Sequence, residues 1–142
     1  MEPPIDTLGD FASPCGNFKV TFDDDVKVAY AYLRGENAIL GDVWLYNRCP
    51  TPDQPEWNDR GNLPFANSKD YMKEGGHVRQ TITVKDVSVD WQYTEGGPKA
   101  FVYIFSELAV VVGVHDKPGY SRFASRNGPL AKPLVFNDPV QE

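Results

Sequence analysis

The two histidines are the side chains best suited to proton transfer at neutral pH, and neither lies in a catalytic motif. His77 follows Gly75-Gly76 at the start of a predicted strand, and His115 follows the strongest run of β-forming residues. The sequence has no GxSxG elbow, no HExxH helix and no cysteine at metal-ligating spacing from a histidine. We therefore assign no catalytic residue, metal or cofactor, and expect that the protein is not an enzyme.

Carboxylates are the next groups that could do chemistry, since glycoside hydrolysis needs two of them at a set separation. With 20 Asp and Glu in the chain, the sequence does not single out one pair. Asp42 is the most notable acid, because it is flanked by Gly41 and Val43 within a predicted strand and an unpaired buried carboxylate is costly. We expect it to point to solvent or to pair with Arg34 or Arg48.

Residues 48–67 form a loop that contains prolines at positions 50, 52, 55 and 64, which remove backbone donors and restrict φ. A loop of this length in a compact domain is more often functional. Trp57 is surrounded there by polar residues, as an interface anchor is, and Asp53, Glu56 and Asp59 would attract a basic partner. The sequence predicts that these four residues bind a partner. In the alternative, Trp57 is a lid over the core and the acids are merely solvated.

The elements that position these residues are mainly β-strands. Alternating apolar residues predict a hairpin from Phe18–Phe22 and Val26–Leu33, and further strands of the same kind follow along the chain. We expect strands at residues 38–47, 77–84, 87–93, 100–105, 108–114 and 134–136, short helices at 67–76 and 120–126, and an irregular arm at 1–17.

The resulting fold prediction is one mainly β domain over residues 1–142, an antiparallel sandwich or curled sheet with one or two short helices. An α+β arrangement is the alternative. A chain of 142 residues can bury a core without a metal or a disulfide. Cys15 and Cys49 are far apart in the sequence, so we expect two free thiols.

The charge of the chain limits its partners. The net charge is −6, and residues 1–75 carry the whole excess, with 13 acids against 7 bases, whereas residues 76–142 hold 7 of each. Such an acidic surface disfavours nucleic acid and anionic membranes. The basic stretch Lys117–Lys132 is expected to contact the acidic half. The N-terminus does not resemble a signal peptide, and the longest apolar run, Leu108–Val112, is much shorter than the about 20 residues of a membrane span, so we expect a cytoplasmic protein.

Two pairs of segments resemble small bacterial proteins of uncharacterised function. These are Asp42–Asn47 with Pro52–Trp57, and Lys117–Ser121 with Gly128–Lys132. The resemblance covers 22 of the 142 residues and implies no activity. The overall profile, which is short, acidic and without catalytic motifs, is similar to that of immunity proteins that neutralise bacterial toxins. That similarity implies a protein partner.

The sequence therefore favours a non-enzymatic binding protein, an immunity or inhibitor protein that covers the active surface of a basic toxin or effector. The alternative is a small enzyme or ligand-binding domain with a pocket near His115, Tyr120 and Arg122. A third alternative is the subunit of a homo-oligomer that pairs through an exposed β edge or through the loop 48–67.

Overall fold

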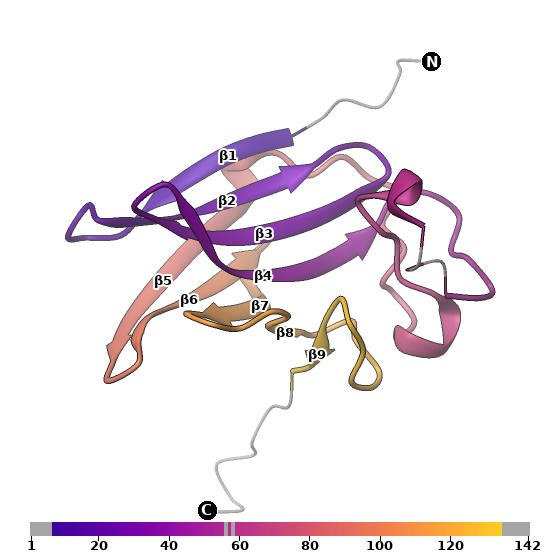
Figure 1. The fold of residues 1–142 in the computed structure, drawn as a ribbon. Helices are drawn as coiled ribbons and strands as arrows, with labels where there is room; N and C mark the ends of the chain where they lie inside the picture. Colours follow the sequence, from indigo (N-terminus) through magenta and orange to yellow (C-terminus); the bar gives the residue numbers. More distant parts are fainter. Residues whose placement is uncertain (1–6, 56, 58, 135–142) are drawn as a thin grey trace, which may run out of the picture.

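Two β-sheets pack against each other in the computed structural model, which describes residues 7–55, 57 and 59–134 (Figure 1). Within these residues there is no α-helix, and the only helical elements are 3-10 turns. The mainly β prediction is therefore confirmed. The first sheet contains β1 (Thr7–Ala12), β2 (Phe18–Asp24), β3 (Val28–Gly35) and β4 (Ala38–Asn47), and the second contains β5 (Val87–Thr94), β6 (Gly97–Ile104), β7 (Glu107–Gly113), β8 (Tyr120–Ser121) and β9 (Lys132–Pro133). The 3-10 turns are η1 (Arg60–Asn62), η2 (Lys69–Tyr71) and η3 (Val84–Asp86).

The first sheet is an antiparallel meander in the order β1-β2-β3-β4. The predicted hairpin is confirmed as β2 and β3. Aspartate side chains build its turn, because Asp25 accepts hydrogen bonds from the amides of Lys27 and Val28, both at 3.0 Å. The β3–β4 turn places Glu36 and Asn37 at φ 48° and 68°, which gives the two-residue turn that favours hairpins.

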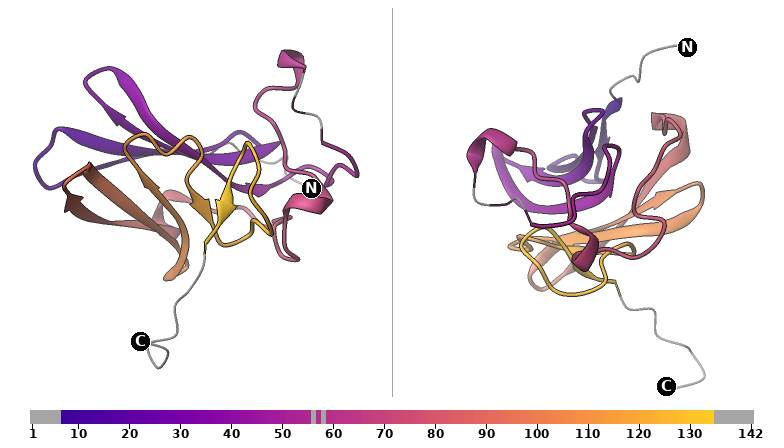
Figure 2. Two further views of the ribbon diagram at one scale, coloured as in Figure 1. Left: turned by 60° about the horizontal axis from the view of Figure 1, so that its bottom comes forward. Right: turned by 90° about the vertical axis from the view of Figure 1, so that its right-hand side faces the viewer.

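The second sheet has the order β5-β6-β7-β8-β9, in which only the β8–β9 pair is parallel. The strands predicted at residues 87–93, 100–105 and 108–114 are confirmed as β5, β6 and β7. In Figure 2 the chain that follows β7 passes along the free edge of β4. There the amide of Asp42 donates to Asp116 O at 2.9 Å and the amide of Gly119 donates to Asp42 O at 2.7 Å, so the two sheets are joined along this edge.

Gly41 allows this joining. A Cβ atom at Gly41 would collide with the carbonyl oxygen of Gly113, so only glycine permits this close approach of the two backbones. The register between β3 and β4 also shifts beside it, between Leu33 and Arg34. Any larger residue at position 41 would separate the sheets.

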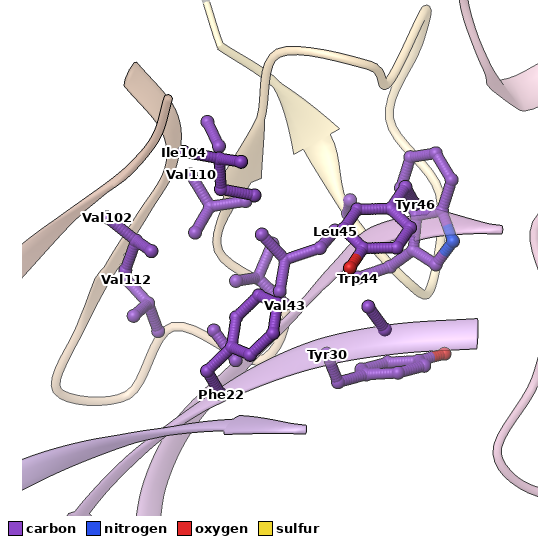
Figure 3. Close-up of a cluster of buried hydrophobic side chains, with 14 of the residues drawn as sticks. Phe22, Tyr30, Val43, Trp44, Leu45, Tyr46, Val102, Ile104, Val110 and Val112 are labelled. Atoms are coloured by element: carbon purple, nitrogen blue, oxygen red, sulfur yellow. The ribbon is translucent and has the colours of Figure 1, made fainter. Parts of the chain in front are cut away.

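The core lies between the inner faces of the two sheets, where Phe22 and Val43 face Val102 and Val112 (Figure 3). All four side chains are fully buried. A register shift between Ala29 and Tyr30 also moves Tyr46 to this inner side, opposite Ala29, and its ring lies 6.5 Å from that of Phe22. Tyr46 therefore does not share the outer face with Asp42, because the extra residue of the bulge changes the alternation of β4.

The two predicted helices are wrong. Residues 67–76 contain one 3-10 turn, η2, after which Met72 pairs with Ala124 and the amide of Lys73 donates to Phe123 O at 2.6 Å. Residues 120–126 supply that partner backbone and include β8 instead of a helix. The two segments therefore satisfy each other's backbone hydrogen-bonding groups. Short-range sequence patterns do not reveal this long-range pairing.

Two further predictions are also wrong. The arm predicted at 1–17 contains a strand, since Thr7–Ala12 pair with β2, and Asp10 accepts a 2.7 Å hydrogen bond from the Thr21 hydroxyl. The strand predicted at 77–84 does not form, and His77 forms an isolated β-bridge with Asn47 instead. Of the predicted strand 134–136, residues 135 and 136 lie outside the described residues. No helix of the described part of the chain is long and apolar enough to cross a membrane.

Candidate functional site

Asn47, the last residue of β4, holds the two ends of the loop 48–67 together. Its Oδ1 accepts hydrogen bonds from Trp44 Nε1 and from the amide of Asn67, both at 2.9 Å, and its Nδ2 donates to Asn67 O at 2.8 Å and to Met72 Sδ at 3.4 Å. Asn47 is fully buried. Because a buried amide must be hydrogen-bonded, this one residue determines where the loop leaves the sheet and where it returns.

A buried ion pair fixes the first residue of the loop. Arg48 Nη1 lies 2.8 Å from Asp24 Oδ2, and the side chains are 6% and 0% exposed. The Tyr46 hydroxyl donates to the same oxygen at 2.8 Å, and the amide of Val26 donates to Asp24 Oδ1 at 3.0 Å. Burial, and then the adjacent Asp24 carboxylate, raise the pKa of Tyr46, so its hydroxyl stays a donor. Arg48 is therefore occupied by Asp24 and does not pair with Asp42.

The far part of the loop rests on the outer face of the first sheet. The Tyr30 hydroxyl donates to Phe65 O at 2.6 Å, which places residues 63–65 over β3. Between this loop and the sheet lies a hollow of about 240 Å³, which we call the tyrosine cup. It is lined by Tyr30, Tyr32, Asp42, Leu63, Pro64, Phe65, Pro129 and Leu130.

The floor of the tyrosine cup comes from strand alternation. Tyr30 and Tyr32 are two residues apart on β3, so both point outward, and their rings stack with centroids 5.9 Å apart and 9° between planes. Asp42 lies directly across from Tyr32 on β4, and Asp23 lies across from Tyr30 on β2. Carboxylates thus flank the pair of rings from both neighbouring strands.

The electrostatic potential in the tyrosine cup is negative. Burial, and then the nearby carboxylates of Asp23, Asp42 and Asp25, raise the pKa of Tyr32 to about 12. Burial also raises the pKa of the half-buried Asp42, and the opposing effect of Lys117 is smaller. Among the residues that the structure describes, no group hydrogen-bonds the Asp42 carboxylate. The negative charge of Asp42 therefore lies in a partly desolvated hollow without a close partner among the described residues.

The substitution Asp42→Asn is expected to stabilise the protein by roughly 0.5 kcal/mol at about pH 7, a modest gain because solvent screens the half-buried carboxylate. Because the pKa of Asp42 is raised in the folded protein, ionisation of this carboxyl opposes folding. The contribution of Asp42 therefore lowers the stability of the wild type as the pH rises through the ordinary carboxyl range, and the variant lacks this contribution. Urea unfolding at about pH 7 and about pH 3 measures this, and the difference should vanish at the lower pH. A variant less stable than the wild type at neutral pH would contradict it.

The described residues predicted for binding in the loop make contacts within the chain. Trp57 packs against the core, donates from Nε1 to Ala66 O at 3.4 Å, and stacks edge-on with Tyr71 at 4.7 Å. Asp53 is exposed and pairs with Lys69 at 2.7 Å, and Asp59 caps η1 through a 2.9 Å hydrogen bond from the amide of Gly61. Glu56 lies outside the described residues. The position of Trp57 agrees better with a lid over the core than with a free anchor.

The residues of the alternative pocket line different hollows. Arg122 lines a cavity of about 290 Å³ at one end of the sandwich, and Tyr120 lines a smaller hollow beside Lys99 and Asp116. His115 is exposed in the turn after β7, where its φ is 71°. Arg122 Nη1 lies 3.2 Å from Glu107 Oε2 and 3.2 Å from Leu108 O, so it already has partners at the mouth of the cavity.

Other reactive groups are few. Within residues 7–55, 57 and 59–134, no group of three or more His, Cys, Asp and Glu could hold a metal ion. Cys15 and Cys49 are not joined in a disulfide. The exposed Cys15 has a pKa lowered to about 7, because the Ser13 hydroxyl, then the Tyr93 hydroxyl, hydrogen-bond its sulfur. Sequence patterns did not indicate this contact, since Tyr93 comes from the other sheet.

The arrangement defines a sandwich-like β protein with an acidic, aromatic hollow on one outer face. No family model matches the chain, and no curated protein or solved structure matches it significantly. The functional inference therefore depends on the geometry of the site.

Proposed function

We propose that this chain is a non-enzymatic binding protein that captures a basic protein through the face formed by the tyrosine cup and the loop 48–67. The observation that carries the proposal is the half-buried Asp42 carboxylate, which has aromatic walls and no hydrogen-bonding partner among the described residues. A site that leaves an acid partly desolvated favours a positively charged partner, because that partner would offset the cost of burial.

The distribution of charge supports a basic partner. The first 75 residues carry the whole acidic excess, and they supply both the sheet under the cup and the loop beside it. Asp53 and Asp59 remain exposed in this loop and would accelerate encounter with a basic protein. The mode of action that we propose is occlusion, in which the chain covers the active surface of a basic toxin or effector in the manner of an immunity or inhibitor protein.

Capture experiments with matched charge variants test this proposal. The bait Asp53→Lys/Asp59→Asn keeps an acceptor for the η1 cap, whereas Asp90→Lys/Glu95→Gln makes the same change in net charge on β5 and its turn. We expect the wild type and the β5 variant to retain one basic protein from the native host. We expect association of the purified partner with the loop variant to be about tenfold slower at low salt. Equal association rates for both variants, or an acidic partner, would refute the proposal.

A second candidate function is the binding of a small apolar ligand in the Arg122 cavity. Its volume of about 290 Å³ and its mostly apolar lining, which includes Ile82, Ile104 and Phe123, favour this alternative. A screen of small apolar ligands in which none raised the melting temperature of the wild type more than that of Arg122→Ala would exclude it.

A further inference from the structure

We infer that the tyrosine cup is a receptor for the guanidinium group of an arginine side chain presented by the partner, an inference that rests on the proposed function and specifies its central contact. The cup combines one carboxylate, from Asp42, with the stacked rings of Tyr30 and Tyr32. A carboxylate beside aromatic faces is the combination that a desolvated organic cation requires.

The size of the cup fits the head of such a side chain. Its volume is about 240 Å³, which exceeds the about 150 Å³ of an apolar cavity that accommodates benzene. Leu63 and Phe65 line the loop side and would contact the aliphatic stem, while Tyr30 and Tyr32 lie on the sheet side. The apolar lining and the single acid would therefore contact different parts of one arginine.

The charges around the cup favour a bound cation, and the chain's own lysine leaves room for one beside Asp42. Asp23 and Asp25 add negative potential around the two tyrosines. Lys117 is the cation that acts on Asp42, but within the described part of the chain the two form no ion pair within 4.0 Å. A guest cation could therefore approach Asp42 more closely than the chain's own lysine does.

Arginine fits this geometry better than lysine does. A guanidinium is planar, so it can stack on a tyrosine ring while it donates two hydrogen bonds to one carboxylate. It is also more weakly hydrated than an ammonium, so entry into a half-buried hollow costs less. Tyr30 and Tyr32 stack on each other with 9° between their planes, and Tyr32 is the less buried of the two, so a guanidinium would stack on the Tyr32 ring.

Titration of the full chain with small probes, followed by backbone amide NMR, tests the inference. The probes are N-acetylarginine amide, its neutral isostere N-acetylcitrulline amide, and N-acetyllysine amide. We expect the arginine amide to give saturable shifts at residues 30–32, 42, 63 and 65, and the citrulline amide to give none. In Asp42→Asn the affinity should fall about tenfold or more, and in the control Asp90→Asn it should be unchanged.

Several results would overturn the guanidinium site. These are no saturable shifts at the cup, equal shifts with citrulline amide, unchanged affinity in Asp42→Asn, or tighter binding of the lysine amide. The amide spectrum itself reports whether each variant is folded. If the loop charge variant bound its partner about tenfold more slowly while the arginine amide failed to bind the cup, the guanidinium site alone would be refuted. If the arginine amide bound to the cup while the loop variant and the β5 variant associated with the partner at equal rates, the proposed function alone would be refuted.

Discussion

Replacement of Arg48 by methionine is expected to lower the free energy of unfolding by about 3–5 kcal/mol. Methionine is an apolar side chain of similar length, but the substitution removes the only cation paired with Asp24 in the described structure. The Asp24 carboxylate, which is 0% exposed, would keep the hydrogen bonds from Tyr46 and from the amide of Val26 but would carry an uncompensated charge. Urea denaturation followed by tryptophan fluorescence measures the loss.

Two controls distinguish the buried ion pair from a general loss of charge. The double variant Asp24→Asn/Arg48→Met removes the stranded charge and should recover part of the lost stability. Lys19→Met breaks the exposed Asp10–Lys19 pair, whose side chains are 51% and 43% exposed, and should cost only about 0–1 kcal/mol. A loss for Arg48→Met as small as that for Lys19→Met would contradict the role assigned to this pair.

The second large effect is expected for Asn47→Ala, with a loss of about 3 kcal/mol. The truncation leaves the Trp44 indole and the backbone amide and carbonyl of Asn67 without their side-chain partners in the interior. The loop 48–67 should then detach at its C-terminal end before the sheets unfold. Amide hydrogen exchange at Asn67 and Ser68 should accelerate more than exchange within β3.

A matched variant separates loss of the acceptor from loss of the whole side chain. Asn47→Asp retains oxygens for Trp44 and for the amide of Asn67, but it loses the Nδ2 donor and introduces a buried charge. It should destabilise the protein mainly above the carboxyl pKa range, whereas Asn47→Ala should do so at all pH values. Uniform acceleration of exchange across both sheets in Asn47→Ala would show that Asn47 does not hold the loop specifically.

The sheets were predictable where one face of a strand is buried and the other is not. Phe22 and Val20 alternate with polar residues, and the turn at Asp25 uses side-chain chemistry that is visible in the sequence. The side on which Tyr46 lies was not predictable, because a bulge changes the alternation without a local signal. Prediction also failed for residues 67–84, whose backbone bonds with residues 121–125 and with Asn47 are long-range.

The candidate site was only partly predictable. The sequence drew attention to Asp42 and to the loop 48–67, and these two regions meet in the tyrosine cup. It did not identify Tyr30 and Tyr32, although their spacing of two on a strand could have placed both rings on one face. The sequence left open whether Trp57 is a partner anchor or a lid, and its indole packs against the core and donates to Ala66 O. A polar neighbourhood in the sequence does not show which way a tryptophan points.

Hydrogen exchange on the chain alone and in complex with its captured partner tests most directly whether the face of the tyrosine cup binds that partner. Loop residues 63–65 form one wall of the cup, and residues 59–61 and 63 are exposed, so exchange in this part of the loop can respond strongly. We predict that partner binding slows exchange at residues 59–66 and leaves residues 87–104 unchanged. Slowing confined to residues 87–104, with none in the loop, would contradict the proposed binding face.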